Sequence, residues 1–113
     1  MHELTITQNM VDIAVEQAEA AGANQIKRIN LVVGQMSGIV EESVQFYFGF
    51  INKDTIAEGA TLNFKTIPTT AKCLNCGTQF ELPEYDWVCP SCHSTKMEIV
   101  SGKELFIESI EVE

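Results

Sequence analysis

The sequence has few basic residues. Its 113 residues include seven Lys and Arg against sixteen Asp and Glu, which gives a formal net charge of −9. Nucleic-acid binding depends on neutralising phosphates with Lys and Arg, so this chain would repel DNA and RNA. An acidic surface suits metal cations or basic protein partners, although carboxylates that merely keep the protein soluble explain the charge equally well. We therefore expect no nucleic-acid partner.

Long apolar runs, internal repeats and low-complexity tracts are also absent. No run approaches the roughly 20 apolar residues that cross a bilayer, and no basic-then-apolar signal peptide opens the chain. The apolar fraction of 45% is nevertheless sufficient for a folded core. We expect a soluble cytoplasmic protein with no membrane partner, in a compartment where thiols stay reduced.

Cysteine is confined to two Cys-x-x-Cys pairs separated by twelve residues: Cys73, Cys76, Cys89 and Cys92. Paired motifs at this spacing typically hold one tetrahedral Zn²⁺ through four thiolates at about 2.3 Å. The alternatives are two structural disulfides or a redox-active dithiol, and neither pair is expected to open a helix as redox motifs do. Four thiolates also leave no position for a catalytic water, so we expect a structural zinc and no enzyme activity.

The apolar periodicity predicts an α+β fold whose first helix begins near Thr5. Thr5 and Gln8 fit a capping box, and Gly22 is a plausible stop. A strand over 28–33 and a second helix over 40–51 should follow. The expected buried face of the first helix comprises Ile6, Met10, Ile13, Ala14 and Ala18. The expected stripe of the second comprises Val40, Val44, Tyr47, Phe48 and Ile51, and we expect the aromatic cluster Phe46, Tyr47, Phe48 and Phe50 to lie in the core.

Two further strands are expected, one around 62–64 and ended by Pro68, the other over 104–112. Three strands and two helices can share one buried face, which predicts a two-layer α/β domain with a three-stranded sheet. The four cysteines would form a zinc-ribbon-like module inserted at 71–100. Because about thirty residues seldom fold alone, this module should need its metal for stability. Its expected small apolar cluster comprises Phe80, Leu82, Trp87, Val88 and Met97.

Histidine is scarce as well, and one of the two histidines is residue 2. His2 sets three nitrogens in series: the Met1 amine, the His2 amide and the imidazole Nδ1. Ni(II) and Cu(II) favour tetragonal nitrogen sites, and the Glu3 backbone nitrogen could complete a square plane. Taken alone, a histidine at this position is a weak signal. His93 directly follows Cys92, and with four thiolates present we expect it to be exposed or to lie beside the zinc shell.

Several motifs occur in order along the chain. They are Met1-His2-Glu3-Leu4, the Val33-Gly34 segment leading to Ser37-Gly38, the turn Ala57-Glu58-Gly59-Ala60, Cys73-x-x-Cys76, Cys89-Pro90-x-Cys92, and the closing Gly102-x-Glu104-Leu105-x-Ile107-x-x-Ile110-Glu111-Val112. Together they resemble the HypA/HybF family of nickel metallochaperones for hydrogenase maturation. The resemblance covers essentially the full chain.

This resemblance implies a nickel-binding α/β domain, residues 1–70 plus 101–113, joined to a zinc-binding domain, residues 71–100. It implies that His2 ligates nickel, that the Met1 amine and the Glu3 backbone are its neighbours, and that the four cysteines carry zinc. It further implies a non-enzymatic carrier that delivers Ni²⁺, with the GTPase HypB, to the [NiFe]-hydrogenase large subunit. In some organisms the urease maturation proteins would be partners too. The alternative is a zinc-ribbon protein–protein adaptor without its own nickel site.

Overall fold

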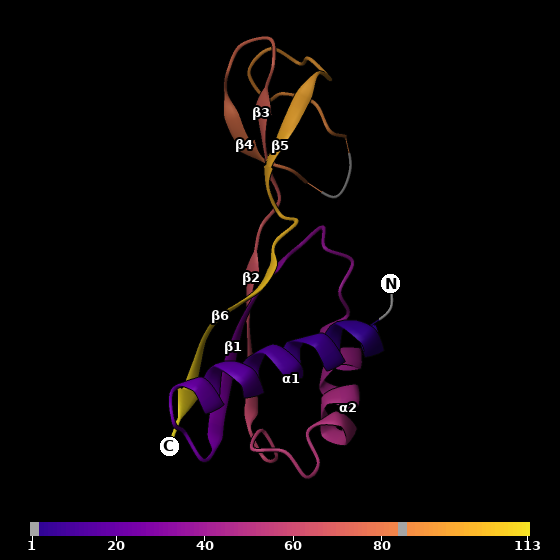
Figure 1. Cartoon of the computed structure of the whole chain (residues 1–113). Helices are drawn as coiled ribbons and strands as arrows, with labels where there is room; N and C mark the ends of the chain where they lie inside the picture. Colours follow the sequence, from indigo (N-terminus) through magenta and orange to yellow (C-terminus); the bar gives the residue numbers. More distant parts are fainter. Residues whose placement is uncertain (1–2, 84–85) are drawn as a thin grey trace. The chain divides into compact units, whose positions relative to one another are not determined.

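The computed structural model describes residues 3–83 and 86–113 (Figure 1). Its helices and strands are α1 (Glu3–Ala20), β1 (Ile26–Gly34), α2 (Glu41–Ile51), β2 (Thr61–Ile67), β3 (Thr70–Cys73), β4 (Gln79–Glu81), β5 (Met97–Ser101) and β6 (Leu105–Val112). Two helices and two three-stranded sheets in this part of the chain confirm the predicted α+β class. Neither described helix is long and apolar enough to cross a membrane.

The described residues fall into two compact units. Val33–Ser37 and Thr66–Leu105 form the unit that carries the cysteines, hereafter the cysteine unit. The other unit, the helical unit, holds both helices and most of β1, β2 and β6. The functional division into a nickel-binding domain at 1–70 plus 101–113 and a zinc-binding domain at 71–100 remains a prediction.

The sheet of the helical unit has the strand order β2-β1-β6. Central β1 is buried at Ile26 and Ile29 and then without interruption from Leu31 to Gly34, as expected of a strand covered by neighbours. On β1 and β6, Arg28 pairs with Glu111 at 3.5 Å, and Asn30 bonds the Ser109 hydroxyl at 3.0 Å. Residue numbers therefore rise along one strand and fall along the other, so the two strands are antiparallel.

Helix α1 begins at Glu3, so the predicted start near Thr5 is wrong. The predicted capping box is wrong as well, because the Gln8 side chain instead donates to the Asp12 carboxylate at 2.9 Å within the helix. The Thr7 hydroxyl donates to the Glu3 carbonyl at 2.6 Å, which ties the first turn together.

The buried face of α1 is rotated relative to the predicted one. Ile13, predicted to be buried, is 51% exposed, whereas Thr7 is fully buried. Thr7 can lie in the core because its hydroxyl is satisfied within the helix. Met10, Ala14 and Ala18 are buried as predicted. The complete buried face is Thr7, Met10, Val11, Ala14 and Ala18.

Helix α2 packs against α1 (Figure 1), and its buried side chains are Val44 and Phe48, which are 3% and 4% exposed. Its predicted position is confirmed, but the prediction that all four aromatic residues lie in the core is wrong. Phe46 and Phe50 are 62% and 59% exposed, and Val40 is exposed as well. On a helix, Phe46 and Phe50 lie about 200° around the axis from Val44 and Phe48, so both faces cannot contact α1.

In the cysteine unit, β3 is the central strand of the order β4-β3-β5 and is antiparallel to both neighbours. The predicted apolar cluster of this segment is largely wrong: Leu82 is buried, but Trp87 and Val88 are 43% and 37% exposed. Outside the undescribed residues 84–85, the buried apolar side chains here are Val33, Ala71 and Leu82, together with two of the cysteines. Such a small core cannot offset the entropy of ordering about forty residues without a further cross-link.

Candidate metal centre

Each Cys-x-x-Cys pair lies on a turn with the same backbone hydrogen bonds. The Gly77 amide donates to the Cys73 carbonyl at 2.9 Å, and the His93 amide donates to the Cys89 carbonyl at 2.8 Å. In both turns the amide of the first cysteine also donates to the carbonyl five residues later, at 2.8 and 2.9 Å. The two turns are thus copies of one local structure, and each presents its sulfur atoms in the same way.

The residue after the second cysteine has a left-handed backbone in both turns. Gly77 has φ 78° and His93 has φ 63°. Glycine adopts this conformation freely, whereas a residue with a Cβ is strained there. His93 therefore occupies the position that glycine fills in the first turn, and the second turn is the more strained of the two.

We expect His93→Gly to raise the free energy of unfolding of the metal-loaded protein by about 0.5–1 kcal/mol, because it removes the left-handed strain. Metal content and affinity should not change, since no sulfur ligand is lost. Urea unfolding and a chelator competition would measure the two quantities. Gly77→Ala is the matched control: a Cβ there meets nothing within 4 Å, so only the strain remains and stability should fall by about 1 kcal/mol. A loss of metal affinity in His93→Gly would instead identify His93 as a ligand.

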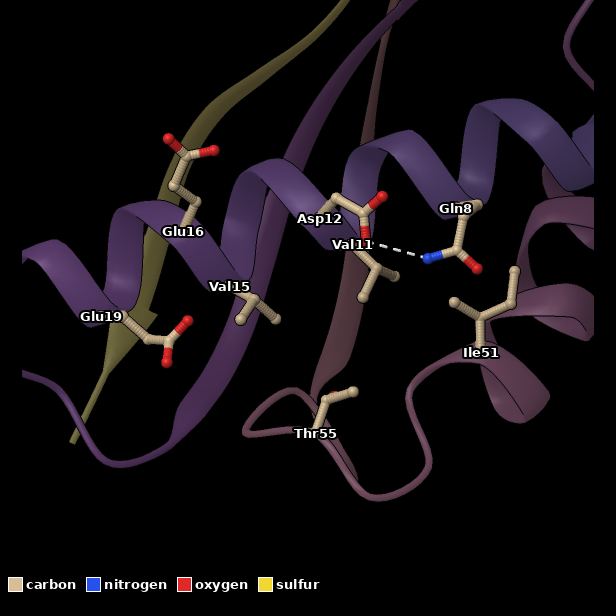
Figure 2. Close-up of a pocket in the computed structure, with 8 residues that line it drawn as sticks. All are labelled: Gln8, Val11, Asp12, Val15, Glu16, Glu19, Ile51 and Thr55. Carbon is tan, nitrogen blue, oxygen red and sulfur yellow. Dashed lines mark hydrogen bonds between the residues drawn. The ribbon is translucent and has the colours of Figure 1, made fainter.

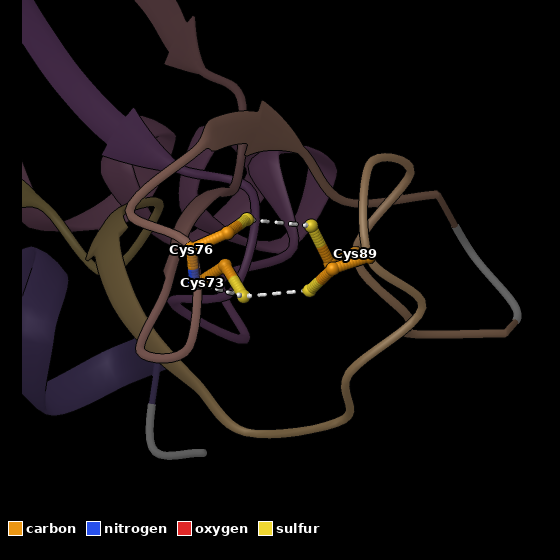
Figure 3. A group of neighbouring side chains, drawn as sticks. Cys73, Cys76 and Cys89 are labelled. Atoms are coloured by element: carbon orange, nitrogen blue, oxygen red, sulfur yellow. Dashed lines mark hydrogen bonds between the residues drawn. The ribbon is translucent and has the colours of Figure 1, made fainter.

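The four sulfur atoms converge on one point, and Figure 3 shows the cluster with Cys73, Cys76 and Cys89 labelled. All four Sγ atoms lie within 4.8 Å of one another, with Cys73 to Cys92 at 3.6 Å and Cys76 to Cys89 at 3.5 Å. Four thiolates around one tetrahedral Zn²⁺ would be about 3.8 Å apart, whereas a disulfide needs about 2.05 Å. The cysteines are free thiols, and their spacing suits a shared metal ion.

Hydrogen bonds favour the thiolate form at the more open side of the cluster. The bond between the Cys76 thiol and the Thr78 hydroxyl (3.2 Å), with further bonds from the Thr78 backbone and Cys89, lowers the pKa of Cys76 to about 6 from 9.0. The Asn75 side-chain amide donates to the Cys92 sulfur at 3.5 Å and lowers the pKa of that thiol too. Cys76 and Cys92 are therefore deprotonated more readily, and their thiolates can bind a cation.

The inner side of the cluster is buried. Cys73 and Cys89 are 1% and 0% exposed. The Cys76 amide favours the Cys73 thiolate, but burial and the neighbouring thiols of Cys92 and Cys76 raise the pKa of Cys73 overall. A bound cation would stabilise the Cys73 thiolate despite its burial, because the positive charge of the ion offsets the negative charge of four adjacent thiolates. The donor set therefore fits a soft divalent metal.

A groove of about 300 Å³ in the helical unit carries three carboxylates, and Figure 2 shows it. Asp12, Glu16 and Glu19 lie beside the apolar side chains of Val15 and Ile51, and the Glu16 and Glu19 carboxylates point in opposite directions. Within residues 3–83 and 86–113, the four cysteines are the only group of three or more His, Cys, Asp or Glu placed to share a metal ion. The carboxylates of the groove are therefore not placed to share one metal ion as the cysteines are.

The predicted nickel ligands Met1 and His2 lie outside the described residues. Glu3 is the first residue of α1. Its backbone nitrogen belongs to the first turn, where amides have no acceptor within the helix. The Glu3 carbonyl, by contrast, accepts the Thr7 hydroxyl.

Comparison with known protein families gives a match over residues 1–112 to the family described as "Hydrogenase/urease nickel incorporation, metallochaperone, hypA". The chain belongs to the HypA family. A hydrogenase maturation factor HypA from Dehalococcoides mccartyi is 46% identical over 113 residues, which cover the whole chain and 95% of that protein. One from Caldanaerobacter subterraneus subsp. tengcongensis is 44% identical over the full length of both proteins.

Two solved structures confirm the HypA fold. The solution structure of a HypA protein has a TM-score of 0.75 at 24% identity and covers 99% of this chain and 96% of that one. The solution structure of the Ni metallochaperone HypA from Helicobacter pylori has a TM-score of 0.68 at 23% identity and covers 99% and 97%. The family match and the relatives above confirm the resemblance to HypA noted in the sequence.

HypA proteins are metallochaperones and maturation factors for nickel incorporation, and they are not enzymes. Four sulfurs around one point agree with this, because a tetrathiolate metal offers no open position for substrate. The redox reading of the cysteine pairs is correspondingly disfavoured. Both pairs lie on turns, Cys73 at the end of β3, and none of the four cysteines is at the start of a helix.

Proposed function

We propose that the protein binds Ni(II) at its N-terminus and delivers it, with the GTPase HypB, to the large subunit of [NiFe]-hydrogenase. The observation that carries this proposal is the family match across residues 1–112, which includes His2 and all four cysteines. The imidazole and amide of His2 and the Met1 amine would hold the metal, and the Glu3 backbone nitrogen would complete the plane. Urease maturation proteins are the second class of receiver that the family description supports.

We further propose that the cysteine cluster holds a structural Zn²⁺ through Cys73, Cys76, Cys89 and Cys92. The sulfur separations of 3.5 and 3.6 Å support a tetrahedral ion of this size. Zinc also suits the task because it has no redox chemistry of its own. The division of labour would be a resident zinc that maintains the fold at 71–100 and a transported nickel held by the α/β domain at 1–70 plus 101–113.

A carrier must release its metal, which favours few side-chain ligands at the end of a chain. A closed shell of cysteines would retain nickel too strongly or be filled by zinc. Nitrogen donors with pKa values of about 6.5 for imidazole and 7.7–8 for the amine compete with protons near neutral pH. Nickel affinity should therefore begin to fall below about pH 8, where the amine takes up a proton, and should fall more steeply below about 6.5, where the imidazole does too, because both groups must be deprotonated to bind.

Nickel titration of untagged, zinc-loaded protein tests the proposal. We expect one Ni(II) with the visible absorption of a square-planar nitrogen site, and an affinity loss of at least about a hundredfold in His2→Ala, since even groups that only support a ligand cost 10–100-fold. His93→Ala, which removes the only other histidine, should leave nickel binding unchanged. Glu3→Ala should retain it as well, because the proposed donor is the backbone nitrogen.

The adaptor hypothesis makes the opposite prediction. If the chain were a zinc-ribbon adaptor without its own nickel site, His2→Ala would bind nickel as well as the wild type does. Zinc content measured in every variant shows whether nickel has entered the cysteine cluster instead. Equal titration curves for the wild type and His2→Ala at constant zinc content would overturn the N-terminal site.

A further inference from the structure

Thr7 is a polar residue on the buried face of α1. It is 0% exposed, and the other residues of that face are Met10, Val11, Ala14 and Ala18, all of them apolar. Valine has nearly the same shape and would place a methyl group where threonine places a hydroxyl. Because a buried hydroxyl is unfavourable unless it has a hydrogen-bond partner, the partner of Thr7 shows what this threonine contributes.

That partner belongs to the first residue of the helix. The Thr7 hydroxyl donates to the Glu3 carbonyl at 2.6 Å, and α1 begins at Glu3. Threonine hydroxyls often bond the carbonyl four residues earlier in a helix. Here the bond lies in a terminal turn, which is where helices fray, and its donor is a side chain held in the core. The Glu3 carbonyl is thus tied to the core through a side chain as well as through the helix backbone.

Burial makes this tie resistant to fraying. Among the described residues, no buried side-chain nitrogen or oxygen atom lacks a hydrogen-bond partner. If Glu3 left the helix, the Thr7 hydroxyl would lose its acceptor while it remained out of contact with water. An exposed threonine would bond to water instead, so only a buried one opposes the opening of the turn in this way. Thr7 therefore keeps α1 helical as far as Glu3.

We propose that Thr7 is a positioning residue for nickel: by tying the Glu3 carbonyl to the core, it holds the Glu3 backbone nitrogen in place for the metal. This inference rests on the proposed N-terminal site, in which Met1 and His2 supply three nitrogens and Glu3 the fourth. The nitrogen and the carbonyl belong to the same residue, so a fixed carbonyl limits where the nitrogen can lie. The nitrogen has no acceptor within the first helical turn and is free to bind.

A chelate made by consecutive residues binds more tightly when its last residue is already ordered. Ordering the backbone of a residue costs conformational entropy, and with Thr7 in place Glu3 is ordered on folding rather than on nickel binding. Loss of the tie should therefore weaken nickel binding about five- to tenfold, which corresponds to the entropy of ordering roughly one residue. Nickel should still bind, because all the proposed donor atoms remain.

Thr7→Val removes the hydroxyl and keeps the shape of the side chain. Nickel titration of the untagged, full-length, zinc-loaded variant should show the loss of affinity of about five- to tenfold. In the nickel-free variant the amide of residue 7 should exchange its hydrogen faster, because an α-helix directs this amide at the carbonyl of residue 3. The melting temperature should stay the same or rise, since valine buries apolar surface in place of the hydroxyl.

Thr7→Ser separates the positioning role from a structural one. Serine keeps the hydroxyl but removes a buried methyl group, so the melting temperature should fall while the nickel affinity stays near that of the wild type. Thr5→Val is the matched control, because Thr5 is an exposed threonine near the start of the same helix. It changes the helix propensity in the same way as Thr7→Val and should bind nickel as the wild type does.

The opposite pattern would overturn the inference. If nickel affinity followed the melting temperature, falling in Thr7→Ser but not in Thr7→Val, Thr7 would be a structural residue only. Unchanged affinity in Thr7→Val beside a loss in His2→Ala would refute the positioning role and leave the N-terminal nickel site standing. Wild-type affinity in both Thr7→Val and His2→Ala would overturn the N-terminal site itself, and the role of Thr7 with it.

Discussion

Removing the metal from the cysteine cluster should unfold the cysteine unit while leaving the helical unit folded. Among its described residues, the cysteine unit has few buried apolar side chains besides Cys73 and Cys89, namely Val33, Ala71 and Leu82. Structural zinc supplies about 10–16 kcal/mol in small zinc domains, far more than these side chains can provide. The helical unit has its own core on α1, β1 and α2 and should not depend on the ion.

Two optical signals would distinguish the units. Trp87 is the single tryptophan and lies in the cysteine unit, so its fluorescence should change when a chelator removes the metal. The far-ultraviolet circular dichroism of α1 and α2 should change little. Cys89→Ser should reproduce the effect without a chelator, because Cys89 is fully buried and its sulfur faces that of Cys76.

Ser91→Ala is the control for Cys89→Ser. Ser91 lies between the two cysteines of the second pair and donates to the Cys89 sulfur through its backbone amide at 3.4 Å, which alanine retains. Metal content and Trp87 fluorescence should therefore match the wild type. Unchanged fluorescence after complete removal of the metal would show that the apolar contacts alone hold this unit, contrary to our expectation.

The cysteine cluster could be predicted from sequence because its signal is local. Two Cys-x-x-Cys pairs need only a turn each, and the two turns do adopt the same backbone hydrogen bonds. The left-handed backbone at His93 could not be predicted, because a histidine carries no such preference in the sequence. Its equivalence to Gly77 is apparent only once the two turns are compared in the structure.

The helices show what periodicity can and cannot determine. The position of α2 was predicted closely, but it has apolar side chains on two opposite faces, so the pattern could not tell Phe48 from Phe46. On α1, a threonine occupies a core position because its hydroxyl bonds the Glu3 carbonyl. A pattern that counts only apolar residues misses Thr7 and shifts the expected face toward Ile13.

The nickel ligands could be predicted only through the family motif. Chelation by the Met1 amine and His2 is chemically sound, but one histidine near the start of a chain is weak information in itself. Its significance comes from the accompanying motifs, and these belong to a family match that covers residues 1–112.

Gly34 directly follows the strand predicted over 28–33, but the crowding around it could not be predicted from the sequence. In the structure its amide donates to the Glu104 carbonyl at 2.7 Å, and the Met36 amide donates to the Gly102 carbonyl at 2.6 Å. A Cβ on Gly34 would lie 2.2 Å from the Gly102 carbonyl carbon and oxygen and 2.6 Å from the Glu104 nitrogen. These are backbone atoms in a hydrogen-bonded segment, so no side-chain rotation relieves the overlap.

Gly102 is crowded in turn, so the segment cannot easily move away from Gly34. It has φ 116°, and a Cβ there would lie 2.7 Å from the Thr69 hydroxyl oxygen and 2.8 Å from the Thr69 Cα. The neighbouring Ser101 hydroxyl donates to the Pro68 carbonyl at 2.9 Å. The segments around residues 34, 69 and 102 of the cysteine unit thus lie in close backbone contact. Glycine at 34 and 102 allows this contact because it has no Cβ.

We therefore expect Gly34→Ala to reduce the free energy of unfolding by at least about 4 kcal/mol, or to prevent folding of the cysteine unit, because a single methyl forces the backbone apart. Gly49→Ala is the matched control, since a Cβ at that helix position meets nothing within 4 Å. It should raise stability by about 1 kcal/mol through helix propensity alone. Urea unfolding of the dilute, zinc-loaded proteins would measure both values. A loss of stability in Gly34→Ala beside a gain in Gly49→Ala would establish that backbone contact, rather than glycine flexibility, determines the residue at position 34. A loss below about 1 kcal/mol in Gly34→Ala would show instead that the three segments can separate at little cost.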